Sequence, residues 1–165
     1  MKFKDLREFI GFLEGKGELL HIRTPVSCEL EISEIADRTI KRGGPALLFE
    51  NVTGYDIPVL INMYGTGQRT AWALGVEHLD DLVERVQGLL RLMQSPPEGL
   101  VNKLRTLGQL VHLGSFQPKT VRDGPCQEVV LHGDDVDLNK FPILTCWPMD
   151  GGRYITLPLV ISRDP

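Results

Sequence analysis

The sequence has few cysteines and no long apolar run, and both shortages narrow the class of protein. Its 165 residues include three cysteines, an odd number with no Cys-x-x-Cys spacing. Neither a disulfide framework nor a zinc ribbon is therefore indicated, and a reduced, intracellular protein is favoured. No apolar stretch approaches the ~20 residues of a membrane span, and the N-terminus lacks the apolar segment of a signal peptide. We expect a cytoplasmic protein without a transmembrane segment.

An excess of positive charge is also missing. The chain has 18 Lys and Arg residues against 22 Asp and Glu residues, for a formal net charge of -4. A general nucleic-acid binder would show a basic stripe, so no nucleic-acid partner is expected. Hydrophobic residues make up 42% and charged residues 24% of the chain, which is ordinary for a globular protein. A chain of this length can bury roughly 70% of its unfolded surface, so one sizeable core is possible.

Hydrophobic periodicity predicts an α/β layer over the first 113 residues. Apolar residues at three- and four-residue steps indicate helices, while short apolar runs bounded by turn residues indicate strands. The two strands after the second helix are separated by a short turn and should pair as a hairpin. Their continuous apolarity indicates that both sheet faces are covered. The expected helices are 4–16, 29–41, 67–74, 78–94 and 100–113, and the expected strands are 18–23, 45–51 and 58–63.

The composition changes after Gly114. Six prolines divide the remainder into pieces too short for long helices, and strands are expected at 127–131 and 154–162. The apolar run 155–161 ends four residues before the chain does. Such a strand needs hydrogen-bond partners at both edges, and the chain offers too few. We therefore expect the natural protein to continue beyond Pro165.

Gly65-Thr66-Gly67 stands after an expected strand and before an expected helix, which is the setting of a dinucleotide-binding fingerprint. The template requires Gly or Ala where this chain has Thr70, and the acidic residue that should end a later strand is missing. A helix-entry turn is the favoured interpretation. A nucleotide-dependent oxidoreductase remains an alternative that an NAD(P) titration would test.

The histidines and cysteines form no recognisable catalytic or metal-binding pattern. None of the histidines has the spacing of a metal site, so structural or surface roles are favoured. Cys146 could act as a nucleophile only with a histidine base that the sequence does not place, and a buried, inert thiol is the preferred interpretation. The four histidines are His21, His78, His112 and His132.

Two acidic segments are ambiguous. Asp134, Asp135 and Asp137 suggest a calcium loop, but the glycine at the sixth position and the glutamate at the twelfth are missing. Capping of a turn by these carboxylates is favoured. Asp150-Gly-Gly-Arg153 is either a hairpin loop or a backbone that lets a bulky ligand approach. The sequence leaves both readings open.

Several blocks of the chain resemble the UbiD decarboxylases, the prenylated-flavin-dependent carboxy-lyases that include 3-polyprenyl-4-hydroxybenzoate decarboxylase. They occur in the family's order from the first expected helix to the last residue. The blocks are Lys-Asp-Leu-Arg-Glu-Phe (4–9), Glu-Ile-Ser-Glu-Ile-Ala-Asp-Arg (31–38), Gly-Gly-Pro-Ala-Leu-Leu-Phe-Glu-Asn (43–51), Gly-Asp-Asp-Val-Asp-Leu (133–138), Pro142, Thr-Cys-Trp-Pro (145–148), Tyr-Ile-Thr (154–156) and Ser-Arg-Asp-Pro (162–165).

The resemblance implies an α/β (α+β) fold in which residues 1–115 form a small N-terminal α/β domain and residues 116–165 begin a split β-barrel flavin domain. It implies non-oxidative loss of CO₂ from an aromatic or α,β-unsaturated (acrylic) acid, most directly 3-polyprenyl-4-hydroxybenzoate in ubiquinone biosynthesis. Prenylated FMN would act as electron sink, Mn²⁺ and K⁺ would bridge its phosphate to protein, and a flavin prenyltransferase would supply it. The parent protein would be a homo-oligomer, cytoplasmic or peripheral to a membrane.

Only one site residue can be transferred from the family. Thr156 corresponds to a position on a strand that faces the flavin pocket. The family's catalytic residues and metal ligands lie beyond Pro165, so no catalytic residue and no metal ligand is expected in this chain, and the chain alone is expected to be inactive. The alternative is a free-standing interaction or scaffold domain of the same fold without catalysis.

Overall fold

The computed structural model describes residues 3–94 and 120–157. The helix expected at 100–113 and residues 158–162 of the strand expected at 154–162 lie outside these ranges. In the described part of that expected strand, Tyr154 forms a single β-bridge and residues 155–157 form no strand. The chain divides into two compact units, of which the first contains residues 1–79 and 137–165 and the second contains residues 80–136. The three-stranded sheet belongs to the first unit.

Helix α1 (Leu6–Gly15) begins and ends at residues suited to these positions. The carboxylate of Asp5 accepts a hydrogen bond from Glu8 N at 3.0 Å, which satisfies one of the free N–H groups of the first turn. At the other end Gly17 adopts a φ of 70°, a conformation that glycine tolerates best. Phe9 and Leu13 are buried on one side of the helix, as the sequence predicts.

Helix α2 (Glu31–Lys41) buries Ile32 and Ala36 and exposes its charged face. The Glu31 carboxylate reaches back to accept a hydrogen bond from Ser27 N at 2.7 Å, and two i,i+4 ion pairs lie on the exposed side. The helix ends before Gly43, which has a φ of 65°. The end expected at residue 41 is confirmed.

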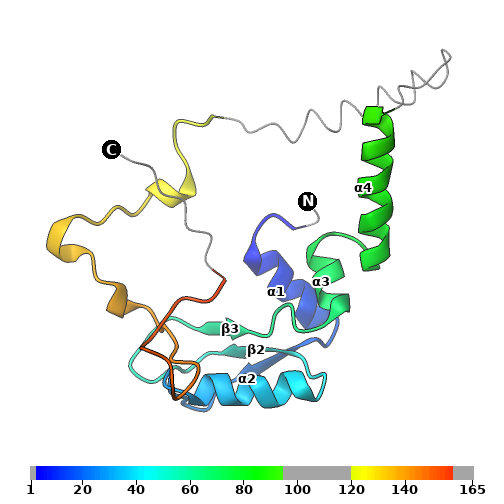
Figure 1. The fold of residues 1–165 in the computed structure, drawn as a ribbon. Helices are drawn as coiled ribbons and strands as arrows, with labels where there is room; N and C mark the ends of the chain where they lie inside the picture. Colours follow the sequence, from blue (N-terminus) through cyan, green and yellow to red (C-terminus); the bar gives the residue numbers. More distant parts are fainter. Residues whose placement is uncertain (1–2, 95–119, 158–165) are drawn as a thin grey trace. The chain divides into compact units, whose positions relative to one another are not determined.

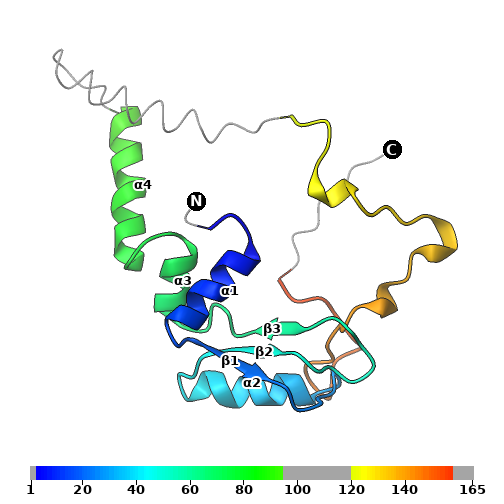
Figure 2. The same ribbon diagram turned by 180° about the vertical axis from the view of Figure 1, so that it is seen from behind.

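Three strands form one sheet in the order β1 (Leu19–Ile22), β2 (Ala46–Phe49), β3 (Val59–Ile61). Strands β1 and β2 are parallel, with Leu19 opposite Ala46, and α2 makes the connection between them (Figures 1 and 2). Strands β2 and β3 are antiparallel, with Leu47 opposite Ile61. The predicted hairpin of the second and third strands is confirmed.

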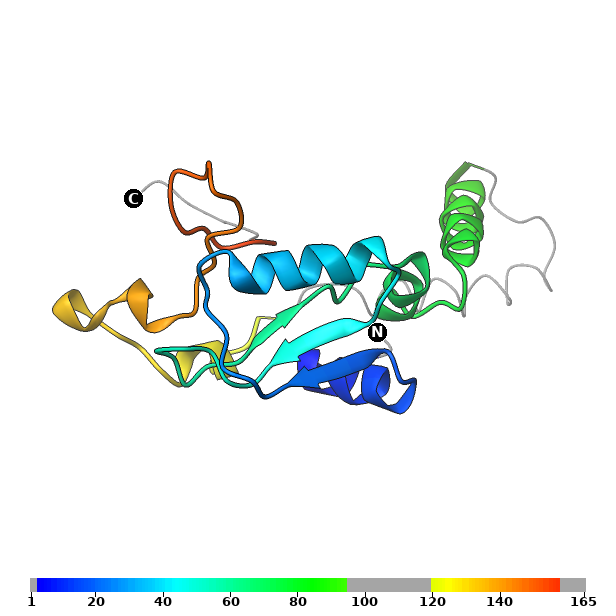
Figure 3. The ribbon, with the colours of Figure 1, turned by 90° about the horizontal axis from the view of Figure 1, so that it is seen from below.

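The sheet is covered on both faces, as the apolarity of its strands predicts. Figure 3 shows α2 on one face and α1 on the other. Successive side chains of β2 point to opposite faces of the sheet. Leu47 and Phe49 belong to the core cluster that contains Ile32 of α2, whereas Ala46 belongs to the cluster of α1. The first core cluster consists of Val26, Cys28, Ile32, Leu47, Phe49, Val52 and Leu144. The expected α/β class is confirmed.

The Gly65-Thr66-Gly67 segment is the entry to helix α3 (Gly67–Ala73), as expected. The Thr66 hydroxyl accepts a hydrogen bond from Arg69 N at 3.2 Å. Gly65 is required for space, because a Cβ there would overlap Asn62 Oδ1 and lie 3.0 Å from Arg69 Nη2. Arg69 itself has no exposed surface. The absence of a side chain at Gly65 therefore leaves room for Asn62 and the buried Arg69.

The second unit contains most of helix α4 (Leu79–Gln94), which confirms the helix expected there. The strand expected at 127–131 is wrong. Residues 125–127 and 133–135 form single 3₁₀ turns, and Val129 between them is 77% exposed. Within the described ranges, no helix is both long and apolar enough to span a membrane.

Candidate functional site

The segment 144–154 is a hairpin, which confirms one of the two readings of its Gly-Gly loop. Leu144 and Tyr154 form an antiparallel bridge, with Tyr154 N donating to Leu144 O at 3.1 Å. The Asp150 carboxylate accepts hydrogen bonds from Cys146 N at 3.2 Å and Trp147 N at 2.9 Å. One side chain therefore closes the loop, a common role for aspartate in turns. We call residues 144–156 the ribbon.

The ribbon is anchored to the α/β layer by its first residues. Thr145 N donates to Cys28 O at 3.1 Å, and Leu30 N donates to Thr145 O at 2.9 Å. Leu144 is only 7% exposed and lies in the core cluster that contains Ile32 of α2. The start of the ribbon is thus held by both backbone pairing and apolar burial.

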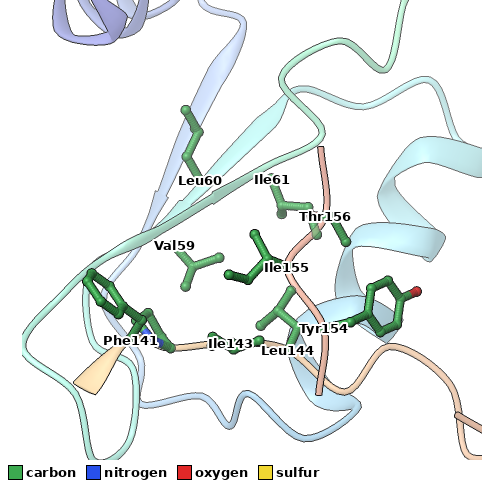
Figure 4. A pocket seen from close by; sticks show the side chains of 10 residues that line it. Val59, Leu60, Ile61, Phe141, Ile143, Leu144, Tyr154, Ile155 and Thr156 are labelled. Atoms are coloured by element: carbon green, nitrogen blue, oxygen red, sulfur yellow. The ribbon is translucent and has the colours of Figure 1, made fainter. Parts of the chain in front are cut away.

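A pocket of about 240 Å³ lies between β3 and the ribbon. Figure 4 shows Val59 and Ile61 of β3 across from Ile155 and Thr156 of the ribbon. Among residues 3–94 and 120–157, β3 is an edge strand of the sheet, because β2 is its one pairing partner there. The pocket is lined by Val59, Leu60, Ile61, Phe141, Pro142, Ile143, Leu144, Tyr154, Ile155 and Thr156.

Thr156, the residue singled out from the sequence, is in the wall of this pocket. Eight of the ten lining residues have purely hydrocarbon side chains, and the other two are Thr156 and Tyr154. A hydrogen bond with the Cys146 thiol is the largest cause that raises the pKa of the Tyr154 phenol, and Figure 4 shows its hydroxyl directed away from Ile155. Thr156 and Tyr154 thus carry the polar side-chain groups among the ten lining residues.

A cluster of ionisable side chains around His21 was missed by the sequence analysis. His21 Nδ1 lies 2.6 Å from Glu50 Oε1, and His21 Nε2 lies 2.7 Å from Glu14 Oε1. The hydrogen bond with Glu50, followed by that with Glu14, raises the pKa of His21. The three residues come from β1, α1 and the end of β2, so no sequence spacing could reveal the cluster. It connects these elements at the surface, and these contacts agree with the structural or surface role expected of His21.

The other candidates have structural roles. Cys146 is half-buried against the core cluster, and burial raises the pKa of the Cys28 thiol. Asp137 accepts hydrogen bonds from Asn139 N and Nδ2, as expected of a turn-capping carboxylate. His112 lies outside the described residues. In the part of the chain that the structure describes, no three His, Cys, Asp or Glu side chains are grouped as metal ligands would be.

Comparison with known proteins gives relatives along the whole chain. An uncharacterised protein of Archaeoglobus fulgidus is 50% identical over 165 residues, which are 100% of this chain and 33% of the relative. The UbiD-class enzyme HmfF of Pelotomaculum thermopropionicum, in an evolved dimeric form in complex with prFMN, is 30% identical with a TM-score of 0.60, covering 93% of this chain and 30% of that chain. The closed form of vanillic acid decarboxylase from Sedimentibacter hydroxybenzoicus is 26% identical with a TM-score of 0.65, covering 93% and 29%.

This chain thus spans about a third of the length of the relatives that it matches. Two domains of one family follow each other along it. The 3-octaprenyl-4-hydroxybenzoate carboxy-lyase N-terminal domain matches residues 10–86, and the Rift-related domain of the same carboxy-lyase matches residues 119–165. The two matches, with the fold shared with UbiD-class enzymes, show that the chain belongs to the UbiD family of carboxy-lyases.

Proposed function

We propose that this chain is the N-terminal part of a UbiD-type decarboxylase that removes CO₂ from an aromatic or α,β-unsaturated acid. The pair of successive family domains supports the reaction class, and the pocket between β3 and the ribbon is the observation that supports a part of the cofactor site in this chain. In this proposal residues 1–115 are the N-terminal domain and residues 116–165 begin the flavin-binding barrel.

The pocket fits one face of prenylated FMN. When bound, that cofactor supplies the electron sink for decarboxylation. Val59, Ile61 and Leu144 would pack against the apolar ring and exclude water, which strengthens polar interactions inside a site. The Thr156 hydroxyl would hydrogen-bond to a polar edge of the flavin and fix its orientation. Pockets for cofactors commonly combine apolar walls with a few such polar groups.

The remaining chemistry is proposed to reside outside the chain. The relatives are about three times as long, and we propose that the corresponding segment contributes the acid–base residues and the ligands of Mn²⁺ and K⁺. The names of the matched domains favour a polyprenylated 4-hydroxybenzoate as substrate. A flavin prenyltransferase would supply the cofactor. The complete protein would be a homo-oligomer in the cytoplasm, at the membrane surface where its substrate is polyprenylated.

The test compares the 165-residue chain with the complete protein encoded by its gene, each co-expressed with a flavin prenyltransferase. The complete protein should purify with flavin absorbance and release CO₂ from the polyprenylated 4-hydroxybenzoate proposed as its substrate. The 165-residue chain should do neither. Turnover by the chain alone, or absence of both flavin and turnover from the complete protein, would overturn the proposal.

The role of Thr156 is tested by two substitutions in the complete protein. Thr156→Val keeps the shape of the side chain and removes its hydroxyl, whereas Thr156→Ser keeps the hydroxyl. Loss of one hydrogen bond in a site of this kind typically costs about 1 kcal/mol, so Thr156→Val should raise the flavin dissociation constant about fivefold. Thr156→Ser should stay near the wild-type value. Equal affinity of all three proteins would remove Thr156 from the site.

A further inference from the structure

Arg153, the residue just before the pocket-forming end of the ribbon, is held at two points. Its Nη1 donates to the Tyr55 hydroxyl at 2.9 Å, and its Nη2 donates to Asn139 Oδ1 at 2.5 Å. The two terminal nitrogens of one guanidinium thus connect the ribbon with two other segments of the first unit. Thr156 follows three residues later.

The Asn139 side chain that contacts Arg153 is itself oriented by hydrogen bonds to Asp137. Asn139 N and Nδ2 both donate to Asp137 Oδ1, at 2.9 and 2.8 Å. With its amide nitrogen directed to Asp137, the side chain of Asn139 presents its oxygen to Arg153. The backbone hydrogen bond from Asn139 is the largest cause that lowers the pKa of Asp137, so this carboxylate remains an acceptor at neutral pH.

The Tyr55 contact is anchored in the α/β layer. Tyr55 lies in the turn between β2 and β3, and its N–H donates to Val52 O at 3.0 Å. Val52 is part of the first core cluster, and the Tyr55 ring packs against that cluster. The hydroxyl that accepts from Arg153 is therefore attached to a rigid part of the fold.

The ribbon needs such an anchor at this position. Gly151 and Gly152 immediately precede Arg153, and a Cβ at either would meet open space, so neither glycine is required for packing. Gly152 has a φ of 152°, in a region that favours glycine, and glycine pairs leave the backbone free to move. After the glycines, one backbone hydrogen bond among the described residues connects the two sides of the ribbon. In it, Tyr154 N donates to Leu144 O.

We propose that Arg153 is a positioning residue, whose bidentate attachment to Tyr55 and Asn139 sets the position of Tyr154 to Thr156 against β3. It acts on the cofactor through the ribbon and is not itself a ligand. The relevance to the cofactor rests on the proposed function, but the positioning of the ribbon does not. The planar fork of arginine can serve two acceptors at once, and lysine offers a single point charge in its place. A positive charge at position 153 without the fork is therefore insufficient to hold the ribbon at both points.

The alternative role for Arg153 is the binding of an anion such as the flavin phosphate. The two assignments make different predictions for conservative variants. Arg153→Lys retains the positive charge and loses the fork, so it damages positioning more than it damages anion binding. Tyr55→Phe removes one acceptor and leaves the charge of Arg153 untouched. Arg42→Lys, at the exposed end of α2, is the matched control.

The first measurement is amide hydrogen exchange in the 165-residue chain without any cofactor. In Arg153→Lys and in Tyr55→Phe, the Tyr154 amide should exchange about tenfold faster than in the wild type, because the loss of one or two hydrogen bonds frees the strand locally. Amides of β2 should keep their wild-type rates in both variants, and Arg42→Lys should match the wild type throughout. Unchanged exchange at Tyr154 in both variants would overturn the proposal.

The second measurement is flavin affinity in the complete protein. Tyr55→Phe and Arg153→Lys should both weaken flavin binding, and to a similar extent. Weaker binding in Tyr55→Phe with normal binding in Arg153→Lys, or normal binding in Tyr55→Phe with loss in Arg153→Lys, would assign Arg153 to another role. If even the wild type binds no flavin, the proposed function fails, while the exchange result still decides whether Arg153 positions the ribbon.

Discussion

Replacement of the buried Arg69 by alanine should be the most damaging single change in helix α3. Its Nη1 donates to Glu18 Oε2 at 2.6 Å, and its Nη2 donates to the carbonyl oxygens of Gly44 and Asn62 at 3.1 and 3.3 Å. These partners come from the start of β1, the turn before β2 and the end of β3. One side chain thus joins the ends of all three strands.

The expected cost follows from the burial of the Arg69 guanidinium. Removal of one partner of a buried ion pair typically costs 3–5 kcal/mol. Here the Arg69 side chain is 1% exposed, whereas that of Glu18 is 40% exposed, so the remaining carboxylate can regain water. We therefore expect the lower end of that range, about 3 kcal/mol. For a chain of this size each kcal/mol lowers the melting temperature by roughly 2–4 °C, which gives a decrease of about 6–12 °C.

Thermal unfolding followed by circular dichroism would measure this decrease, with Arg38→Ala as control. Arg38 forms an ion pair with Glu34 on α2 whose members are 69% and 52% exposed, and exposed pairs of this kind contribute at most about 1 kcal/mol. The control should therefore melt within about 4 °C of the wild type. A decrease in Arg69→Ala no larger than that in Arg38→Ala would refute the reasoning from burial.

Two further changes test the geometry around the sheet. Hydrogen bonds with Glu50 and Glu14 raise the pKa of His21, so its contribution to stability is complete below the unfolded value of about 6.5 and is lost as the pH rises through the higher folded value. Denaturant titrations at several pH values should show this loss in the wild type, and a loss of the same size in His21→Gln would contradict it. Gly65→Ala should cost about 1–3 kcal/mol through overpacking against Asn62, and an unchanged denaturation midpoint would be incompatible with the close approach.

The α/β layer was predictable because its signals are local. Each helix carries its own apolar periodicity and its own stop, as in α2 with the glycines after Lys41, and each strand is a short apolar run between turn residues. The main error was the strand at 127–131. An apolar run becomes a strand only where another strand is available to pair with it, and Val129 is instead largely exposed. The availability of a partner is not encoded in the run itself.

The pocket could be predicted only in part, for a related reason. The resemblance selected Thr156, but the opposite wall comes from β3, whose apolar residues have an ordinary core pattern. The role of Arg69 was missed because arginine is normally exposed. A retrospective signal existed in Gly65, which shortly precedes Arg69 and has no room for a Cβ.

The two family domains share one structural core in this chain, and this bears on how the site is built. Leu144 belongs to the Rift-related match but packs in the cluster of α2 and β2, which belong to the N-terminal match. Thr145 exchanges backbone hydrogen bonds with Cys28 and Leu30. Because the ribbon is held by the layer and β3 forms the facing wall, loss of the layer would remove both sides of the pocket at once. The part of the chain that matches the N-terminal domain is therefore part of the pocket's framework, and destabilisation of its core should weaken the ligand binding proposed at Thr156.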